Sequence, residues 1–447
     1  MRNKRISVFV LALSALMAEA APSASSQAGP EKKLKQGEYE IYNDVVKDVN
    51  TGNFTKAIAD LDAWKAKFPD SEYKDDRLAF YVQAYAGANQ AAKSLAAATE
   101  LLSRDLNATF PGPAGQPTVI RVLYSTVWAV SHDPNPAPDE LAAGERAARQ
   151  LMAYDQKLPG VTDAQWAQVR ADMREKAGAA LLYEAMLPGL QAMAKQPPDC
   201  AAADSAYARA LGDYPDKSIL SYELGRAASC QTKTQPERIS LALYEFERAA
   251  VIDPTLDDPT SDPKKIQTFA DNSYIKVHGS DEGLDRLKQQ VKESPLPPAG
   301  FKIKTAAEIA EEKRAELEKS NPQLALWMKI KGALSDTDGD QYFVSQLKDS
   351  AVPQLRGTLL EAKPACRPTE LLVAVPLPDS AQTLRPEIQL KFEKPLTGRP
   401  ETNTEFYWEG VPSAFTRDPF LLTMDTEASK IEGLKTMPCA PATTKKK

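Results

Sequence analysis

The 447-residue sequence has few of the residues that enzyme and metal sites require. Its two histidines, His132 and His278, stand far apart, which excludes a histidine-rich metal site. It contains no G-x-S-x-G nucleophile elbow, no phosphate-binding G-x-x-x-x-G-K-S/T loop, no H-E-x-x-H motif and no C-x-x-C pair. We therefore predict a protein that is not an enzyme, with no catalytic residue, no metal and no cofactor.

One acidic stretch, SDTDGDQYF, is similar to a calcium-binding loop only in part. Asp336, Asp338 and Asp340 have the right spacing. However, Gly339 comes two positions too early, and the twelfth position is Leu347 instead of glutamate. The pattern favours an ordinary loop rich in Asp and Gly.

The sequence also lacks concentrated positive charge and a second long apolar run. Lys and Arg total 55 against 61 Asp and Glu, and basic residues cluster only at Lys445–Lys447. Because phosphate binding needs a concentrated basic surface, we expect no nucleic-acid partner. After the N-terminus no segment reaches the roughly 18 apolar residues of a spanning helix, so no integral membrane segment is expected after signal removal.

The N-terminus has the three-part layout of a secretory signal peptide. Basic residues open the chain, an apolar run covers Ile6–Met17, and Ala18-Glu19-Ala20 forms a small-x-small cleavage site, with cleavage expected near Ala20 or Ala21. We predict a signal peptide over 1–21 and a disordered linker rich in Pro, Ser and Ala over 22–32. The mature protein is expected to be periplasmic or secreted.

The stretch LALYEFERAAVIDP, which begins at Leu241, predicts a helix with one face, here called the seam, that packs against a neighbouring helix. Ala242, Phe246 and Ala249 are spaced four and three, so they share a helical face. Small residues on this face allow close approach of another helix, and Pro254 ends the helix. Two further segments repeat the spacing, with Ala203, Tyr207, Ala210 and Pro215 in one and Ala57, Leu61, Trp64 and Pro69 in the other.

Together with Leu224-Gly225 on the preceding helix, these segments resemble the tetratricopeptide repeat (TPR) superfamily. The resemblance implies a mainly α fold, with a TPR-like α-solenoid of antiparallel helix pairs over 33–293. In such a solenoid Tyr222 and Arg226 would point into the concave groove, where Tyr and Arg are favoured binding anchors. The segment KFPDSEYKDDRLAFYVQAY is also similar to repeat proteins that assist cell-envelope assembly.

The pattern changes after the repeats. Residues 294–340 are expected to form a helical connector, in which PQLALWMKIKGAL buries Leu324, Trp327 and Met328 beneath the next domain. From 341 to 439 five short β-rich runs predict a small β domain, either a barrel similar to the oligonucleotide/oligosaccharide-binding (OB) fold or a sandwich. The basic tail 440–447 is expected to be disordered. A capping box at Thr162 opens a helix that Pro188-Gly189 should break or kink.

Two classes of function remain open. The first is a non-catalytic exported scaffold or adaptor that binds a protein or peptide partner in the concave groove. The second is a secreted glycan-binding protein or enzyme with its site in the β domain around Tyr407 and Trp408, because aromatic rings can stack on sugars. A buried strand residue is the competing interpretation of Trp408.

The sequence contains four cysteines. An even number in an exported chain indicates disulfides. Cys200 and Cys230 fall in the helical region, at the start of one helix and the end of the next, and antiparallel packing would bring these ends together. Cys366 and Cys439 flank the β region. We predict the bonds Cys200–Cys230 and Cys366–Cys439, with four free buried thiols as the alternative.

Overall fold

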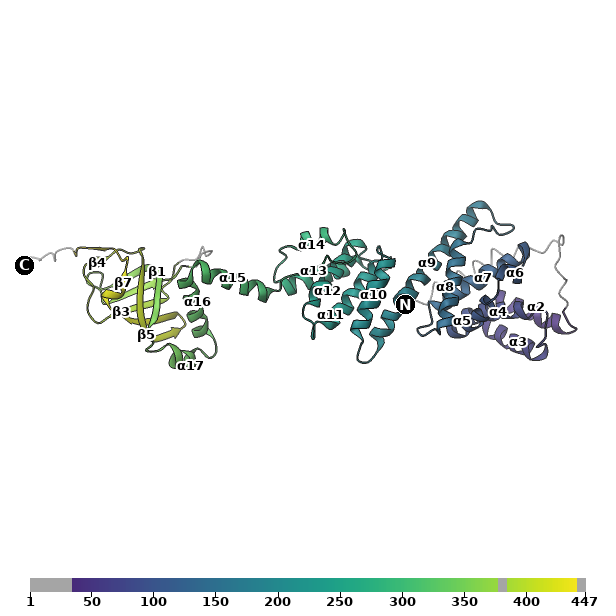
Figure 1. Cartoon of the computed structure of the whole chain (residues 1–447), viewed down its shortest axis with the longest axis horizontal. Coiled ribbons are helices and arrows are strands. Elements are labelled where there is room, and N and C mark those ends of the chain that lie inside the picture. Colours follow the sequence, from purple (N-terminus) through teal and green to yellow (C-terminus); the bar gives the residue numbers. More distant parts are fainter. Residues whose placement is uncertain (1–33, 377–383, 440–447) are drawn as a thin grey trace, which may run out of the picture. The chain divides into compact units, whose positions relative to one another are not determined.

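The computed structural model describes residues 34–376 and 384–439, drawn in Figure 1. The predicted signal peptide, the linker 22–32 and the tail 440–447 lie outside the described residues. The chain divides into two compact units, Met1–Ile303 and Lys304–Lys447. The first is helical and the second carries the β-strands, as the sequence predicts.

The helical unit is a succession of helices in which most neighbours along the chain pack against each other, whereas α14 packs on α12. Its described helices are α2 (Glu38–Asn50), α3 (Phe54–Lys67), α4 (Lys74–Gly87), α5 (Ala91–Leu102), α6 (Leu106–Thr109), α7 (Gly112–Val130), α8 (Pro138–Ala153), α9 (Asp163–Ala194), α10 (Cys200–Asp213), α11 (Ser218–Gln231), α12 (Arg238–Ile252), α13 (Pro263–His278) and α14 (Leu284–Gln290).

The spaced seam residues are buried in all three segments, as their periodicity predicts. On α12, Ala242 and Ala249 are fully enclosed and Phe246 is nearly so. A Cβ atom at Gly225 of α11 would lie 2.7 Å from the Phe246 ring, so only glycine allows this approach of the two helices. A Cβ atom at Gly189 would meet the Tyr207 ring at 2.6 Å, which repeats the arrangement between α9 and α10.

Helix α9 begins as predicted and is not broken at Pro188-Gly189, where the sequence indicates a break or a kink. Thr162 and Gln165 form the expected capping box, with the Gln165 backbone N–H donating to the Thr162 hydroxyl at 3.3 Å. The helix nevertheless continues through Pro188 to Ala194. The packing of Gly189 against Tyr207 on α10 holds this last part in place, and tertiary contact thus outweighs the local cost of an internal proline.

The helical unit extends to Ile303, beyond the predicted boundary at 293, because helix α12 holds the following segment. The Tyr244 hydroxyl donates to the Ser294 carbonyl at 2.9 Å. The backbone N–H of Ile303 donates to Ser240 Oγ at 3.0 Å, and the Phe301 ring packs edge-on against Tyr244. Residues 294–303 therefore belong to the helical unit and not to a separate connector.

The second unit centres on a closed five-stranded barrel. Its strands pair in the order β1-β2-β3-β6-β5 and back to β1, with β3 and β6 parallel and the other pairs antiparallel. Closure removes exposed strand edges and excludes the sandwich alternative. The strands are β1 (Val352–Lys363), β2 (Glu370–Ala374), β3 (Ile388–Phe392), β4 (Arg399–Pro400), β5 (Glu405–Arg417), β6 (Phe420–Thr426), β7 (Ile431–Glu432) and β8 (Thr436–Met437).

Helices precede the barrel in this unit, and α16 contributes most of their buried side chains to its core. They are α15 (Ala306–Ser320), α16 (Pro322–Ser335) and α17 (Gly339–Tyr342), which continues into a π-helical turn at Phe343–Leu347. A 3₁₀ turn at Ala428–Lys430 follows β6. Helix α15 buries none of its side chains, whereas Leu324 and Trp327 of α16 join the barrel core.

The prediction for Met328 was wrong, because its side chain is 46% exposed. Helix α16 instead buries Ile330 and Leu334, which follow Trp327 at helical spacing. The Trp327 Nε1–H donates to Glu387 at 3.1 Å, and Lys331 forms an ion pair with the same carboxylate. These contacts fix the helix against the barrel.

Candidate functional site

The sequence-predicted groove residues Tyr222 and Arg226 lie on helix α11 in different surroundings. Tyr222 is half-buried, and its ring centroid lies 5.9 Å from Phe246 and 6.1 Å from Phe269. The Arg226 side chain is 48% exposed and forms an ion pair with Glu223 at 2.8 Å. Tyr222 therefore belongs to an aromatic group, whereas the charge of Arg226 is already partly compensated.

We call Tyr222, Phe246 and Phe269 the aromatic cluster; its rings come from α11, α12 and α13. The Phe246 and Phe269 rings meet edge-to-face with centroids 4.9 Å apart, an arrangement that aromatic quadrupoles favour. Phe246 is almost fully buried, but Phe269 is 40% exposed. The cluster thus begins in the helix seam and ends at the surface, where it offers an apolar contact to another molecule.

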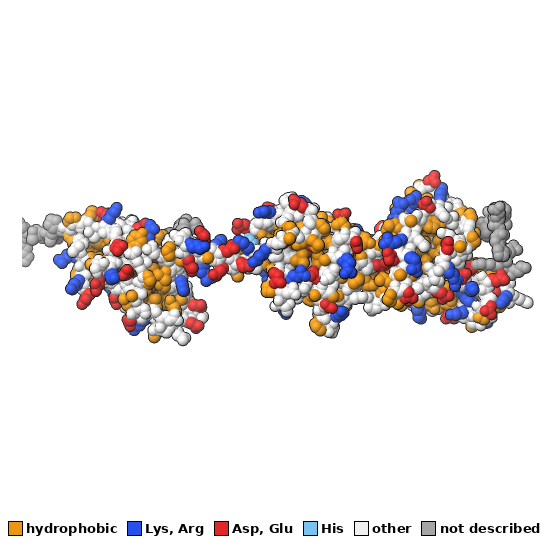
Figure 2. All heavy atoms as spheres, in the orientation of Figure 1, with side chains coloured by type: hydrophobic (Ala, Val, Ile, Leu, Met, Phe, Trp, Pro, Cys, Tyr) orange, Lys and Arg blue, Asp and Glu red, His pale blue; other side chains and the backbone are white. Residues whose placement is uncertain are grey.

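An open hollow of about 560 Å³ adjoins the cluster on α13, and we call it the α13 pocket. Phe269 lines it, so the aromatic cluster and the pocket share a side chain. The full lining is Asp262, Lys264, Lys265, Thr268, Phe269, Asn272, Ser273 and Lys276. Over the part that Figure 1 labels α10–α14, Figure 2 shows hydrophobic side chains at the surface with charged side chains around them.

We did not predict the α13 pocket from the sequence, although the spacing of its residues indicates a shared helical face. Lys265, Phe269, Asn272 and Lys276 follow each other at intervals of four, three and four residues, which places them on one helical face. An amphipathic stripe of this kind is ordinarily solvated. Only the contact of Phe269 with rings from two other helices distinguishes it.

Helix α12 also encloses two carboxylates. Glu245 and Glu247 are fully buried, and their oxygens have no hydrogen-bond partner among the described residues. Burial raises the pKa of Glu245 to about 8, against the opposing influence of Ser221 and Arg248. Burial, reinforced by the nearby charge of Asp271, raises the pKa of Glu247 to about 8 as well, although Lys288 opposes it.

Raised carboxyl pKa values can mark general acids, but these two glutamates are fully enclosed and do not line the α13 pocket. A general acid must come within hydrogen-bonding reach of its substrate. The ionisation of Glu245 and Glu247 therefore bears on the stability of the helical unit.

The barrel places its two aromatic candidates in different environments. Trp408 is fully buried, with its ring 5.3 Å from Phe406, so it cannot stack on a sugar. Tyr407 is half-buried, with the Arg356 guanidinium 5.8 Å from its ring centroid, and Arg356 pairs with Glu405. A pocket of about 570 Å³ at another part of the barrel includes Phe392, Glu409 and Lys430 but neither aromatic candidate.

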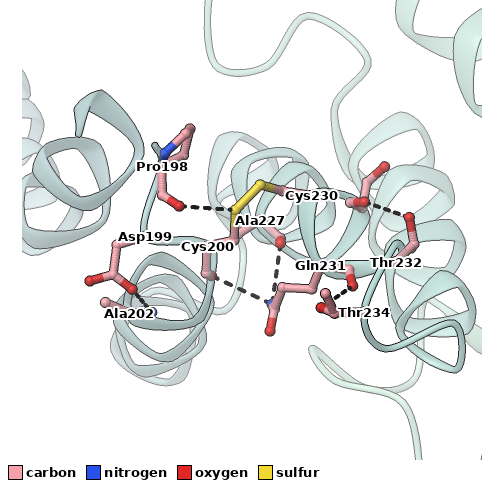
Figure 3. Close-up of a disulfide and its surroundings, with 10 residues drawn as sticks. Pro198, Asp199, Cys200, Ala202, Ala227, Cys230, Gln231, Thr232 and Thr234 are labelled. Carbon is pink, nitrogen blue, oxygen red and sulfur yellow. Dashed lines mark hydrogen bonds between the residues drawn. A yellow bond between two sulfur atoms is a disulfide. The ribbon is translucent and has the colours of Figure 1, made fainter. Parts of the chain in front are cut away.

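Both predicted disulfides are present, each within one unit. Figure 3 shows Cys200 at the start of α10 bonded to Cys230 at the end of α11, with Cα atoms 5.9 Å apart. The Asp199 side chain caps α10, and the Gln231 side-chain amide donates to the Ala227 carbonyl at 3.2 Å. Cys366 and Cys439 form the second bond, which ties the end of the described chain to the barrel.

The two histidines lie in separate parts of the helical unit. His132 stacks on Trp128 and His278 on Tyr274, each within one helix or at its end. Among residues 34–376 and 384–439, no group of three His, Cys, Asp or Glu side chains could hold a metal ion. In the same ranges no helix is both long and apolar enough to cross a membrane.

Comparison with known proteins adds no further assignment. No protein-family model matches the chain, and a search of curated proteins found no sequence that matches it.

Proposed function

We propose that this protein is a non-catalytic exported scaffold that binds an extended segment of a protein partner on the concave face of a TPR-like solenoid formed by 33–293. The observation that carries the proposal is the aromatic cluster, because it exposes Phe269 beside a hollow of the surface. Large apolar side chains at a concave surface are typical anchors of binding sites.

The repeat assignment rests on two features of the helix pairs. The seam residues predicted from spacing are buried in each of the three segments. Gly189 and Gly225 each face an aromatic ring of the following helix at a distance that no other residue permits. Such recurrence favours repeated helix pairs over a unique bundle. A role in cell-envelope assembly fits an oxidising compartment, which the two disulfides support.

For the β domain we infer an OB-like barrel, because a closed five-stranded barrel of mixed pairing suits that fold. The fold implies no ligand. The alternative function, a glycan-binding or enzymatic site around Tyr407 and Trp408, lacks support because Trp408 is enclosed in the core.

The proposal is tested by panning a library of random dodecapeptides on the purified full-length protein. We expect enriched peptides to bind in solution and to lose at least about tenfold in affinity for the Tyr222→Ala/Phe269→Ala variant, since large aromatic anchors dominate binding energy. Tyr39→Ala is the matched control, because Tyr39 is an exposed tyrosine on α2. If no peptide is enriched, or if enriched peptides bind the folded double variant unchanged, the proposal is wrong.

A further inference from the structure

Three of the four charged side chains that line the α13 pocket are lysines, and the fourth is Asp262. Lys264, Lys265 and Lys276 line it, and none of these lysines forms an ion pair with any residue in the described ranges. The chain as a whole has more acidic than basic residues, so three unpaired lysines around one hollow depart from its average surface. Uncompensated charge at a binding surface favours a partner of opposite charge.

Two acidic residues at or on α13, Asp262 and Asp271, have hydrogen-bond or ion-pair partners other than the lysine side chains of the pocket. The Asp262 carboxylate accepts a hydrogen bond from the Lys264 backbone N–H at 3.0 Å and thereby caps α13. Asp271 lies on the same helix, but it pairs with Lys288 at 2.6 Å and accepts from Gln267 at 3.2 Å. The lysines of the pocket therefore remain available to carboxylates from another molecule.

The apolar part of the surface is also defined. Phe269 is exposed beside Lys265 and Lys276 on the same helical face, and its ring rests on Phe246 and Tyr222. A ring supported from behind loses little conformational freedom when a partner packs on it. The surface thus combines one apolar contact with flanking cations.

We propose that the partner segment is an acidic peptide that carries a large apolar residue. Its apolar side chain packs on Phe269, and Asp or Glu side chains on either side pair with Lys265 and Lys276. This inference rests on the proposed function and specifies the chemistry of its partner.

The test uses three fluorescein-labelled nonapeptides and the full-length protein. The first has a central Phe flanked on each side by four alternating Asp and Glu residues; in the second Asn and Gln replace the acids, and in the third Ala replaces the Phe. We expect the acidic Phe peptide to bind at least about tenfold more tightly than either of the others, because charge and apolar contact act together. Raising NaCl from 0.05 to 0.5 M should weaken its binding, since exposed charges are screened.

Substitutions locate the site. Lys265→Gln/Lys276→Gln should weaken the acidic peptide about tenfold and leave the neutral Phe peptide unchanged, whereas Phe269→Ala should weaken both. Lys65→Gln/Lys67→Gln is the matched control, because these lysines are exposed on α3. Circular dichroism verifies that each variant is folded.

Three results would overturn the inference. If the acidic and neutral Phe peptides bind equally and both depend on Phe269, the partner is not acidic, although the proposed function stands. If heparin competes fully and the Phe-to-Ala peptide binds as tightly as its parent, the lysines form a general polyanion site. If none of the peptides binds although panning yields ligands, the partner has another chemistry; failure of the panning itself rejects the proposed function.

Discussion

The helical unit and the barrel differ in the kind of polar side chain that they bury. The helical unit encloses ionisable side chains, among them Glu38, Glu245, Glu247 and Arg248. In the part of the barrel unit that the structure describes, the buried polar side chains are the hydroxyl groups of Thr358, Thr423 and Thr426. Strands alternate inward and outward, so charged residues remain outside, whereas a helix that neighbours surround on several sides has no polar face left.

The buried glutamates of the helical unit differ in the direction of their pKa shifts. Glu38 accepts from Trp64 Nε1 at 2.7 Å and from the Lys35 backbone at 3.0 Å. Burial alone would raise its pKa, but hydrogen bonds from Ser71, Lys35 and Trp64 outweigh this effect and lower it. For Glu245 burial outweighs the opposing influence of Ser221 and Arg248, so its pKa is raised. The comparison shows that a buried carboxylate is ionised only where its hydrogen bonds outweigh the cost of burying its charge.

The largest expected effect is a loss of stability of the helical unit as the pH rises. The folded pKa of about 8 for Glu245 and for Glu247 exceeds the ordinary value, so the folded state binds protons more tightly than the unfolded state. The associated stability is present below about pH 4.5 and is lost as the pH rises through 8. Each linked proton contributes up to about 1.4 kcal/mol per pH unit.

Urea unfolding followed by circular dichroism at pH 5 and pH 8 measures this loss. Glu245→Gln/Glu247→Gln should stabilise the helical unit at pH 8 by several kcal/mol and flatten the pH dependence, since neutral amides replace groups that ionise. Glu38→Gln is the control of opposite sign, because the lowered pKa of Glu38 adds stability at high pH. An equal pH dependence in wild type and double variant would contradict the assignment.

The barrel should respond most strongly to loss of its apolar core. Trp408→Ala removes a fully buried ring and is expected to cost about 3–5 kcal/mol. Tyr407→Ala, one position along the strand, removes a half-buried ring and should cost less. Differential scanning calorimetry checks both, and a Trp408→Ala barrel as stable as the wild type would show that this ring does not belong to the core.

The two disulfides, one in each unit, close chain segments of different length, so their contributions to the free energy of unfolding should differ. The chain-entropy model gives about 4.4 kcal/mol for the separation of 73 residues closed by Cys366–Cys439 and about 3.6 kcal/mol for the separation of 30 closed by Cys200–Cys230. Cys366→Ser/Cys439→Ser should therefore destabilise the barrel slightly more than Cys200→Ser/Cys230→Ser destabilises the helical unit. Calorimetry of the two variants measures both losses, and a larger loss in the helical unit would reverse the expected order.

Periodicity made much of this fold predictable. The spacing of Ala242, Phe246 and Ala249 predicted a buried helix face. Ile388, Leu390 and Phe392 alternate with polar residues in one of the β-rich runs, and all three are buried on β3. The Cys200–Cys230 pair followed from the ends of antiparallel helices, and the Cys366–Cys439 pair from the position of both cysteines beside the β region. Each of these inferences uses only residues close in sequence, or a connection that the fold class itself requires.

Contacts between distant residues set the limit of prediction. Acidic residues on a helix ordinarily indicate a solvated face, which holds for α15 but fails for Glu245 and Glu247, because neighbouring helices cover α12 on every side. The exposure of Met328 and the continuation of α9 past Pro188 likewise depend on packing partners. The aromatic cluster joins residues from three helices, and no spacing rule brings Tyr222 to Phe269.

The smallest expected effects concern two glycines in adjacent helices, and they test the repeat packing directly. A Cβ atom at Gly225 would lie 2.7 Å from the Phe246 ring and 3.2 Å from the Ala242 carbonyl oxygen, so Gly225→Ala must separate α11 from α12. Overpacking of this kind costs about 1–3 kcal/mol. At Gly212 of α10 a Cβ atom would meet nothing within 4 Å, so Gly212→Ala should instead stabilise the unit by about 0.5–1 kcal/mol through helix propensity. Urea unfolding of both variants measures whether each substitution lowers or raises the free energy of unfolding. A Gly225→Ala protein as stable as Gly212→Ala would show that α11 and α12 do not need the close approach on which the repeat assignment depends.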